Sequence, residues 1–129
     1  MLTIRQDRIG PDVVVLKITG QICLGRYCRD VEWHVEDLLK ANERKVILDL
    51  SGVTHLDSTG VGIIVLCSGK LKTAGGELRV AGAKGTVEEI LRMTLVDRIV
   101  SFYPTAAPAA EGSPPPPKPY RVQESVAQV

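Results

Sequence analysis

The segment KVILDLSGVTHLDSTG, residues 45–60, constrains the fold most, because in it a strand leads into a helix through a short polar turn. Val46, Leu48 and Leu50 recur at every second position, which is the period of a β-strand. After the turn, apolar residues recur at helical spacing. These are Val61, Ile64, Cys67, Leu71 and Ala74. The sequence therefore predicts a strand, a turn and a helix in direct succession.

The turn itself carries three side chains with oxygen atoms: Asp57, Ser58 and Thr59. Such residues cap helices by accepting hydrogen bonds from free backbone N–H groups, so we expect one of them to be the N-cap. The same N–H groups and the helix dipole also tolerate a phosphate group. Ser58 is thus either a plain cap or a phosphorylation site, and Thr59 is the other hydroxyl that a kinase could use. Gly60 and Gly62 are poor helix formers, which indicates a close approach by the sheet or by a partner.

Composition excludes several classes of function. A chain of 129 residues that is 44% hydrophobic supports one domain with a modest core. Its net charge is +1 and its basic residues alternate with acidic ones, so we expect no nucleic-acid partner. No stretch is apolar for long enough to span a membrane or to act as a signal sequence, so we expect a cytoplasmic protein.

No cofactor, metal or catalytic group is expected. Cys23, Cys28 and Cys67 lack metal-ligand spacing with either histidine, and reduced thiols in or near the core are the simplest interpretation. A hydrolytic triad of His55, Asp57 and Ser58 would need the imidazole between the other two groups, which one tight turn rarely allows. No glycine-rich phosphate loop followed by lysine is present. We therefore predict that the chain is not an enzyme.

The remaining elements follow from the same patterns. We expect strands at residues 2–8, 13–19, 46–50, 78–81 and 99–103, and helices at 30–41, after Ser58, and around 87–94, with a hairpin through Gly10 and Pro11. Crossovers between the later strands predict a mixed, mostly parallel sheet of four to five strands, in the α/β class. Charges at alternate strand positions, as at Lys17, Glu77 and Arg79, predict helices on only one face, and so a two-layer domain.

Composition changes at Pro104, where the sequence becomes TAAPAAEGSPPPPKPYRVQESVAQV. Proline runs favour extended polyproline geometry and build no core. We therefore predict a domain at residues 1–103 and a disordered, proline-rich tail at residues 104–129.

The tryptophan of the first predicted helix is a candidate partner contact. If Val31, Val35 and Leu38 face the sheet, Trp33 points nearly the opposite way, toward solvent. His34 lies at the boundary of the apolar side. Two alternatives for Trp33 stay open: the helix begins later, or the proline-rich tail covers the ring.

Taken together, VILDLSGVTHLDSTGVGIIVLCSGKLKTAGGELRVAG and the later TVEEILRMTLVDRIV resemble STAS domains of the bacterial anti-anti-sigma type, the anti-sigma factor antagonists. The resemblance spans roughly residues 2–103. In that family the serine after the aspartate is phosphorylated by an ATP-dependent anti-sigma factor, which implies Ser58 here. It further implies a partner-switching regulator that binds the kinase when unmodified and leaves it when phosphorylated. A serine/threonine phosphatase acting in trans would reverse the modification.

The resemblance also implies a partner-binding surface and leaves alternatives. Its members would be Asp57, Thr59, Gly60, Cys23 and Trp33. The chain departs from the family at Cys23, where an acidic residue is common, and it lacks a recognisable fourth helix after the last strand. A constitutive STAS subunit of a stress-signalling or lipid-transport complex is the alternative, and a small-ligand or nucleotide-binding domain is a third possibility. Self-association as a weak homodimer stays open.

Overall fold

Five strands form one sheet in the order β1-β2-β3-β4-β5. The computed structural model describes residues 2–25 and 27–111. Along the chain the strands are β1 (Leu2–Ile9), β2 (Val13–Ile22), β3 (Lys45–Leu56), β4 (Glu77–Ala81) and β5 (Ser101–Tyr103). The helices are α1 (Asp30–Lys40), α2 (Ser58–Thr73), α3 (Gly85–Met93), the short 3-10 helix η1 (Val96–Arg98) and α4 (Ala106–Glu111).

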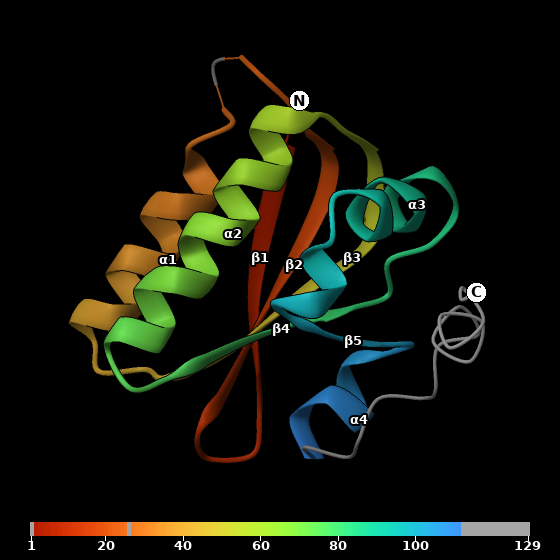
Figure 1. Cartoon of the computed structure of the whole chain (residues 1–129). Coiled ribbons are helices and arrows are strands. Elements are labelled where there is room, and N and C mark those ends of the chain that lie inside the picture. The colour runs from red at the N-terminus through yellow and green to blue at the C-terminus, as the bar shows by residue number, and fades with distance from the viewer. Residues whose placement is uncertain (1, 26, 112–129) are drawn as a thin grey trace.

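The strand directions agree with the sequence prediction of a mixed, mostly parallel sheet. β1 and β2 form an antiparallel hairpin, and Gly10 takes a positive φ of 67° in its turn. The pairs β2–β3, β3–β4 and β4–β5 are all parallel. Figure 1 shows α1 and α2 side by side over the sheet, with α3 next to them. The carboxyl end of β3 therefore opens directly into α2.

The main core lies between the sheet and the helices α1, α2 and α3. Alternate strand residues such as Val14, Leu16 and Leu48 point into it, and Ile64 and Leu71 of α2 meet them there. All five side chains are fully buried. This packing fixes α2, and with it the turn at its N-terminus, against the sheet.

The prediction that helices cover only one face was wrong. Helix α4 packs on the opposite face, where Ala109 joins a second cluster with Val13, Val15, Ile47, Ala81 and Tyr103. Arg79 explains the error: its guanidinium donates to the backbone oxygen of Ala109 at 2.6 Å and lies over the Tyr103 ring. The Arg79 side chain, which the sequence pattern placed in solvent, instead holds α4 against the sheet.

Helix α4 lies beyond the domain boundary that was expected at residue 103, and it is a fourth helix where none was expected. Ordered structure continues past Tyr103 to Glu111 through α4. Pro108 lies in its first turn, where a missing N–H breaks no helical hydrogen bond. Residues 112–129, which include most of the predicted tail, lie outside the described part of the structure.

Three strands differ from the prediction by more than one residue. β2 continues to Ile22 instead of ending at residue 19. β3 continues to Leu56 and so reaches the turn without a break, with register shifts against β2 near Thr19 and Gln21. β5 begins only at Ser101, because η1 occupies residues 96–98. Among residues 2–25 and 27–111, no helix has the length and apolar character that a membrane span requires.

Candidate functional site

Asp57 organises the turn between β3 and α2. It is the N-cap of α2, and its Oδ1 accepts a hydrogen bond from the Gly60 backbone N–H at 2.9 Å. Its Oδ2 accepts a second bond, also 2.9 Å, from the backbone N–H of Leu24 in the loop after β2. One carboxylate thus caps the helix and fastens a loop that is 33 residues away in sequence. The prediction that a turn residue is the N-cap is confirmed.

These bonds hold the pKa of the Asp57 carboxyl below its usual range, since N–H groups stabilise the charged form. The Leu24 bond is the largest cause and the Gly60 bond the next. Asp57 is therefore ionised at neutral pH. A negative charge stands permanently beside Ser58.

Gly60 allows α2 to approach the sheet. A Cβ atom here would overlap the backbone oxygen of Ile22 and would lie 2.6 Å from Cδ1 of Leu56. A Cβ at Gly62 would meet nothing within 4 Å, and Gly62 is exposed. The two glycines therefore differ: Gly60 is required by the fold, whereas no contact within the described structure requires Gly62.

Ser58 is the first residue of α2, and its side chain is exposed to solvent. Within the described residues its hydroxyl makes no hydrogen bond, since Asp57 does the capping. Thr59, the other hydroxyl of the turn, is half-buried. Ser58 therefore carries the more accessible of the two hydroxyl groups.

The loop between β2 and α1 forms the adjoining surface. Leu24 is 78% exposed although its backbone is tied to Asp57, and Tyr27 is also exposed. Cys23 is half-buried, and burial, together with the nearby charge of Asp57, raises the pKa of its thiol. The exposed side chain of Leu24 thus lies in a loop that is fastened to Asp57, the residue before Ser58, and exposed apolar side chains are common where another protein docks.

The ring of His55 contacts residues of β2 and β3. Nδ1 of His55 lies 2.9 Å from Oγ1 of Thr54 and 3.5 Å from Nε2 of Gln21. No contact joins its ring to Ser58 in the part of the chain that the structure describes. That part also holds no cluster of histidine, cysteine, aspartate or glutamate able to bind a metal ion.

A family model described as the STAS domain matches residues 5–109. The chain belongs to the STAS domain family. A Thermotoga maritima protein named as an anti-sigma factor antagonist is 30% identical over 104 residues, which covers 81% of this chain and 92% of the relative. The crystal structure of an anti-sigma factor antagonist from Thermotoga maritima superposes with a TM-score of 0.77 and 28% identity, over 84% of this chain and 92% of that one.

The Bacillus cell fate determinant SpoIIAA shares the STAS fold. Its unphosphorylated and phosphorylated forms each superpose with a TM-score of 0.65 over 85% of this chain, at 16% and 12% identity. They cover 97% and 99% of the SpoIIAA chains. At these identities the likeness shows the fold alone.

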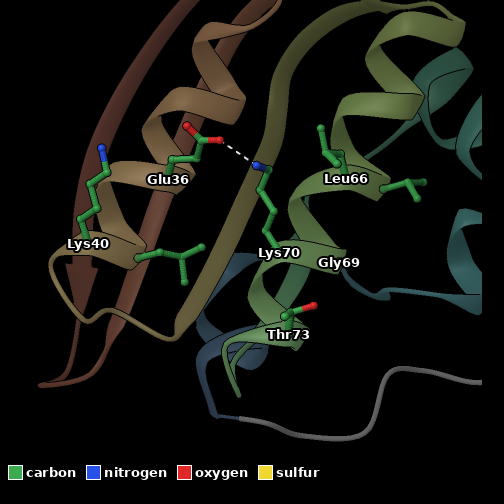
Figure 2. Close-up of a pocket in the computed structure, with 8 residues that line it drawn as sticks. Glu36, Lys40, Leu66, Gly69, Lys70 and Thr73 are labelled. Carbon is green, nitrogen blue, oxygen red and sulfur yellow. Dashed lines mark hydrogen bonds and ion pairs between the residues drawn. The ribbon is translucent and has the colours of Figure 1, made fainter.

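A groove of about 730 Å³ lies between α1 and α2 of the STAS domain. Glu36 of α1 and Lys70 of α2 form an ion pair of 2.7 Å across it (Figure 2). Leu66 and Gly69 of α2 also line the groove. This groove was not predicted from the sequence. A hint of the groove in the sequence is Leu66, an apolar residue that falls outside the buried face of α2 and is 45% exposed.

The structure brings most of the predicted site residues together. Asp57, Ser58, Thr59 and Gly60 form the turn, and Cys23 lies beside it in the loop that Asp57 fastens. Trp33 lies apart, on the flank of α1, and it is exposed as predicted. Leu24 and Tyr27 were not predicted, because only the long-range bond from Leu24 to Asp57 places their loop next to the turn.

Proposed function

We propose that this STAS domain is a phospho-regulated anti-sigma factor antagonist. Unmodified, the surface around Ser58 binds an anti-sigma factor that is also a serine kinase, and phosphorylation of Ser58 releases it. The observation that carries the proposal is the exposed Ser58 hydroxyl at the start of α2, directly after Asp57, which fastens the loop of the exposed Leu24. The name of the Thermotoga relative supports the same class of function.

The docking surface that we propose has two parts. One is the loop with Leu24 and Tyr27, and the other is the exposed side of α2 from Ser58 through Gly62 to Leu66. These three residues of α2 are spaced four apart, so they lie on one side of the helix. Gly62 presents bare backbone there, which lets a partner come close to the helix.

Phosphorylation supplies the switch through charge. A phosphate adds about −1.5 to −2 charge and sits next to the ionised Asp57. The N-terminal dipole of α2 tolerates this charge, so the fold stays intact. A partner packed on Ser58 would have to bury the phosphate, and a penalty of roughly 3 kcal/mol weakens binding about a hundredfold. A serine/threonine phosphatase, acting in trans, restores the binding form.

The test is phosphorylation and binding with a candidate ATP-binding anti-sigma factor. Mass spectrometry of the chain after incubation with this partner and ATP is expected to find phosphate on Ser58 and none on Thr59. Ser58→Ala is expected to keep binding and Ser58→Asp to weaken it about a hundredfold, the roughly 3 kcal/mol given above. Thr86→Asp is the matched control, because Thr86 is an exposed hydroxyl residue in the first turn of α3.

Two outcomes would reject the switch. Equal binding by wild type, Ser58→Ala and Ser58→Asp would indicate a constitutive STAS interaction subunit instead. Equal weakening by Ser58→Asp and Thr86→Asp would show that added charge acts without regard to position, so that Ser58 has no special place in the interface.

A further inference from the structure

Strand β1 forms one edge of the sheet, and within residues 2–25 and 27–111 no strand pairs with its outer side. This edge strand has eight residues, whereas β5 at the opposite edge has three. Its central residues, 5–8, are all exposed. A long open edge presents a row of backbone N–H and C=O groups to which another strand can bind. β1 is therefore the place where this sheet can be extended.

The charges on β1 are complementary to a second copy of the same strand. Arg5 and Asp7 lie on one face of β1, two residues apart, and their charged groups are separated by 3.3 Å. Two copies of β1 can pair antiparallel about a twofold axis at Gln6. Each Arg5 then lies directly opposite Asp7 of the other copy, so the dimer contains this pair of opposite charges twice.

The neighbouring registers lack this match. An axis at Arg5 sets the two Arg5 side chains opposite each other, and an axis at Asp7 does the same for the two Asp7 carboxylates. Like charges directly opposite each other destabilise a strand pair. The charge pattern of the strand thus selects the register that is centred on Gln6.

Helix α1 lies beside the same centre. Nε2 of His34 is 3.3 Å from Oε1 of Gln6. The neighbouring Trp33 is 54% exposed, and with Leu2 and Ile4 of β1 it lines a hollow of about 300 Å³. A twofold axis perpendicular to the sheet keeps both α1 helices on one face, so the two hollows would meet across the new strand pair. The exposed indole rings would then be covered by the other copy.

The acidic groups of the hollow also gain a partner in this register. Asp30 and Asp37 line the hollow together with Ile4. The register sets Arg8 of the other copy opposite Ile4, so its guanidinium faces these carboxylates. Arg8 pairs with Glu43 in its own chain at 2.6 Å, and its five N–H donors can serve a second carboxylate as well.

We propose that two copies of the chain associate through β1, paired antiparallel about Gln6 into one continuous sheet. The turn at Ser58 follows β3, two strands inward from this edge. The association is therefore independent of the proposed switch at Ser58, and it can be tested on the chain alone.

Sedimentation equilibrium of the full chain, from micromolar to millimolar concentration, measures the dissociation constant of the dimer. Arg5→Asp sets like charges opposite each other twice and is expected to weaken the dimer about tenfold. Arg5→Asp combined with Asp7→Arg exchanges the two charges and is expected to restore the wild-type constant. Lys84→Glu makes the same change of charge at an exposed residue before α3 and is expected to have no effect.

Trp33 reports where the two copies meet, because it is the one tryptophan of the 129-residue chain. Acrylamide quenching of its fluorescence is expected to fall as the protein concentration rises, and to do so only at higher concentration in Arg5→Asp. A wild-type chain that is monomeric at every concentration would overturn the proposal. So would a dimer that Arg5→Asp and Lys84→Glu weaken equally, or one whose formation leaves the quenching of Trp33 unchanged.

Discussion

Gly60→Ala should destabilise the domain although alanine is the better helix former. The added methyl group would overlap the backbone oxygen of Ile22 and press on the Leu56 side chain at 2.6 Å. A backbone oxygen of β2 cannot move without disturbing the β2–β3 pairing, so the start of α2 must shift. Overpacking of this kind costs about 3 kcal/mol at its usual upper end, and helix propensity returns about 1 kcal/mol. The expected net loss is about 2 kcal/mol.

Gly62→Ala and Gly69→Ala are the matched controls in the same helix. Both glycines are exposed, and a Cβ atom at either would meet nothing within 4 Å. Each substitution should therefore raise the free energy of unfolding by about 1 kcal/mol, and the melting temperature by about 4 °C. Urea denaturation of the three variants measures the difference. A Gly60→Ala variant as stable as Gly62→Ala would refute the view that α2 needs a glycine to approach β2.

Three further results are expected. Asp57→Asn should lower the free energy of unfolding by about 1 kcal/mol at pH 7, because the variant loses the hydrogen bond from Leu24. The folded pKa of Asp57 is lowered, so its stabilising effect is present above the ordinary aspartate pKa of about 4 and fades as the pH falls below it. Urea titrations of the wild type and the variant should therefore converge in acid. Burial raises the pKa of the Cys67 thiol to about 12, so at neutral pH a thiol reagent should modify Cys67 only as fast as the domain opens; modification as fast as in urea would contradict this. Arg79→Met should speed hydrogen exchange in α4 without changing α2, and equal exchange in α4 would show that the Ala109 bond does not hold it.

The strand-turn-helix unit could be predicted from sequence because its causes are local. Strand period, helical period and the capping aspartate all lie within residues 45–74. Helix α4 could not be predicted in the same way. It has six residues, its buried residue is a small one, Ala109, and it depends on the sheet and on Arg79 rather than on its own propensity. A short proline-containing segment gives no such signal along the chain.

The candidate site likewise has a part that depends on local sequence and a part that depends on long-range contacts. Asp57 and Ser58 could be assigned from the turn, and the ambiguity over Gly60 and Gly62 was settled only by the position of Ile22. The loop with Leu24 joins the site through one bond between residues 33 apart. Such a bond leaves no pattern in a single sequence, so Leu24 and Tyr27 could not be predicted, and Cys23 of the same loop was expected only from the family resemblance.

The double use of Asp57 bears on how a phosphate at Ser58 would act. Its two oxygens hold Leu24 and Gly60, so the carboxylate cannot turn away from an added phosphate without releasing the loop or uncapping α2. In the free chain water screens the two charges, and their repulsion costs about 1 kcal/mol. In a complex that excludes water the same repulsion grows several-fold, and the phosphate also loses its hydration. Most of the free energy of the proposed switch would therefore belong to the docked state, so that phosphorylation would expel a partner and leave the domain folded.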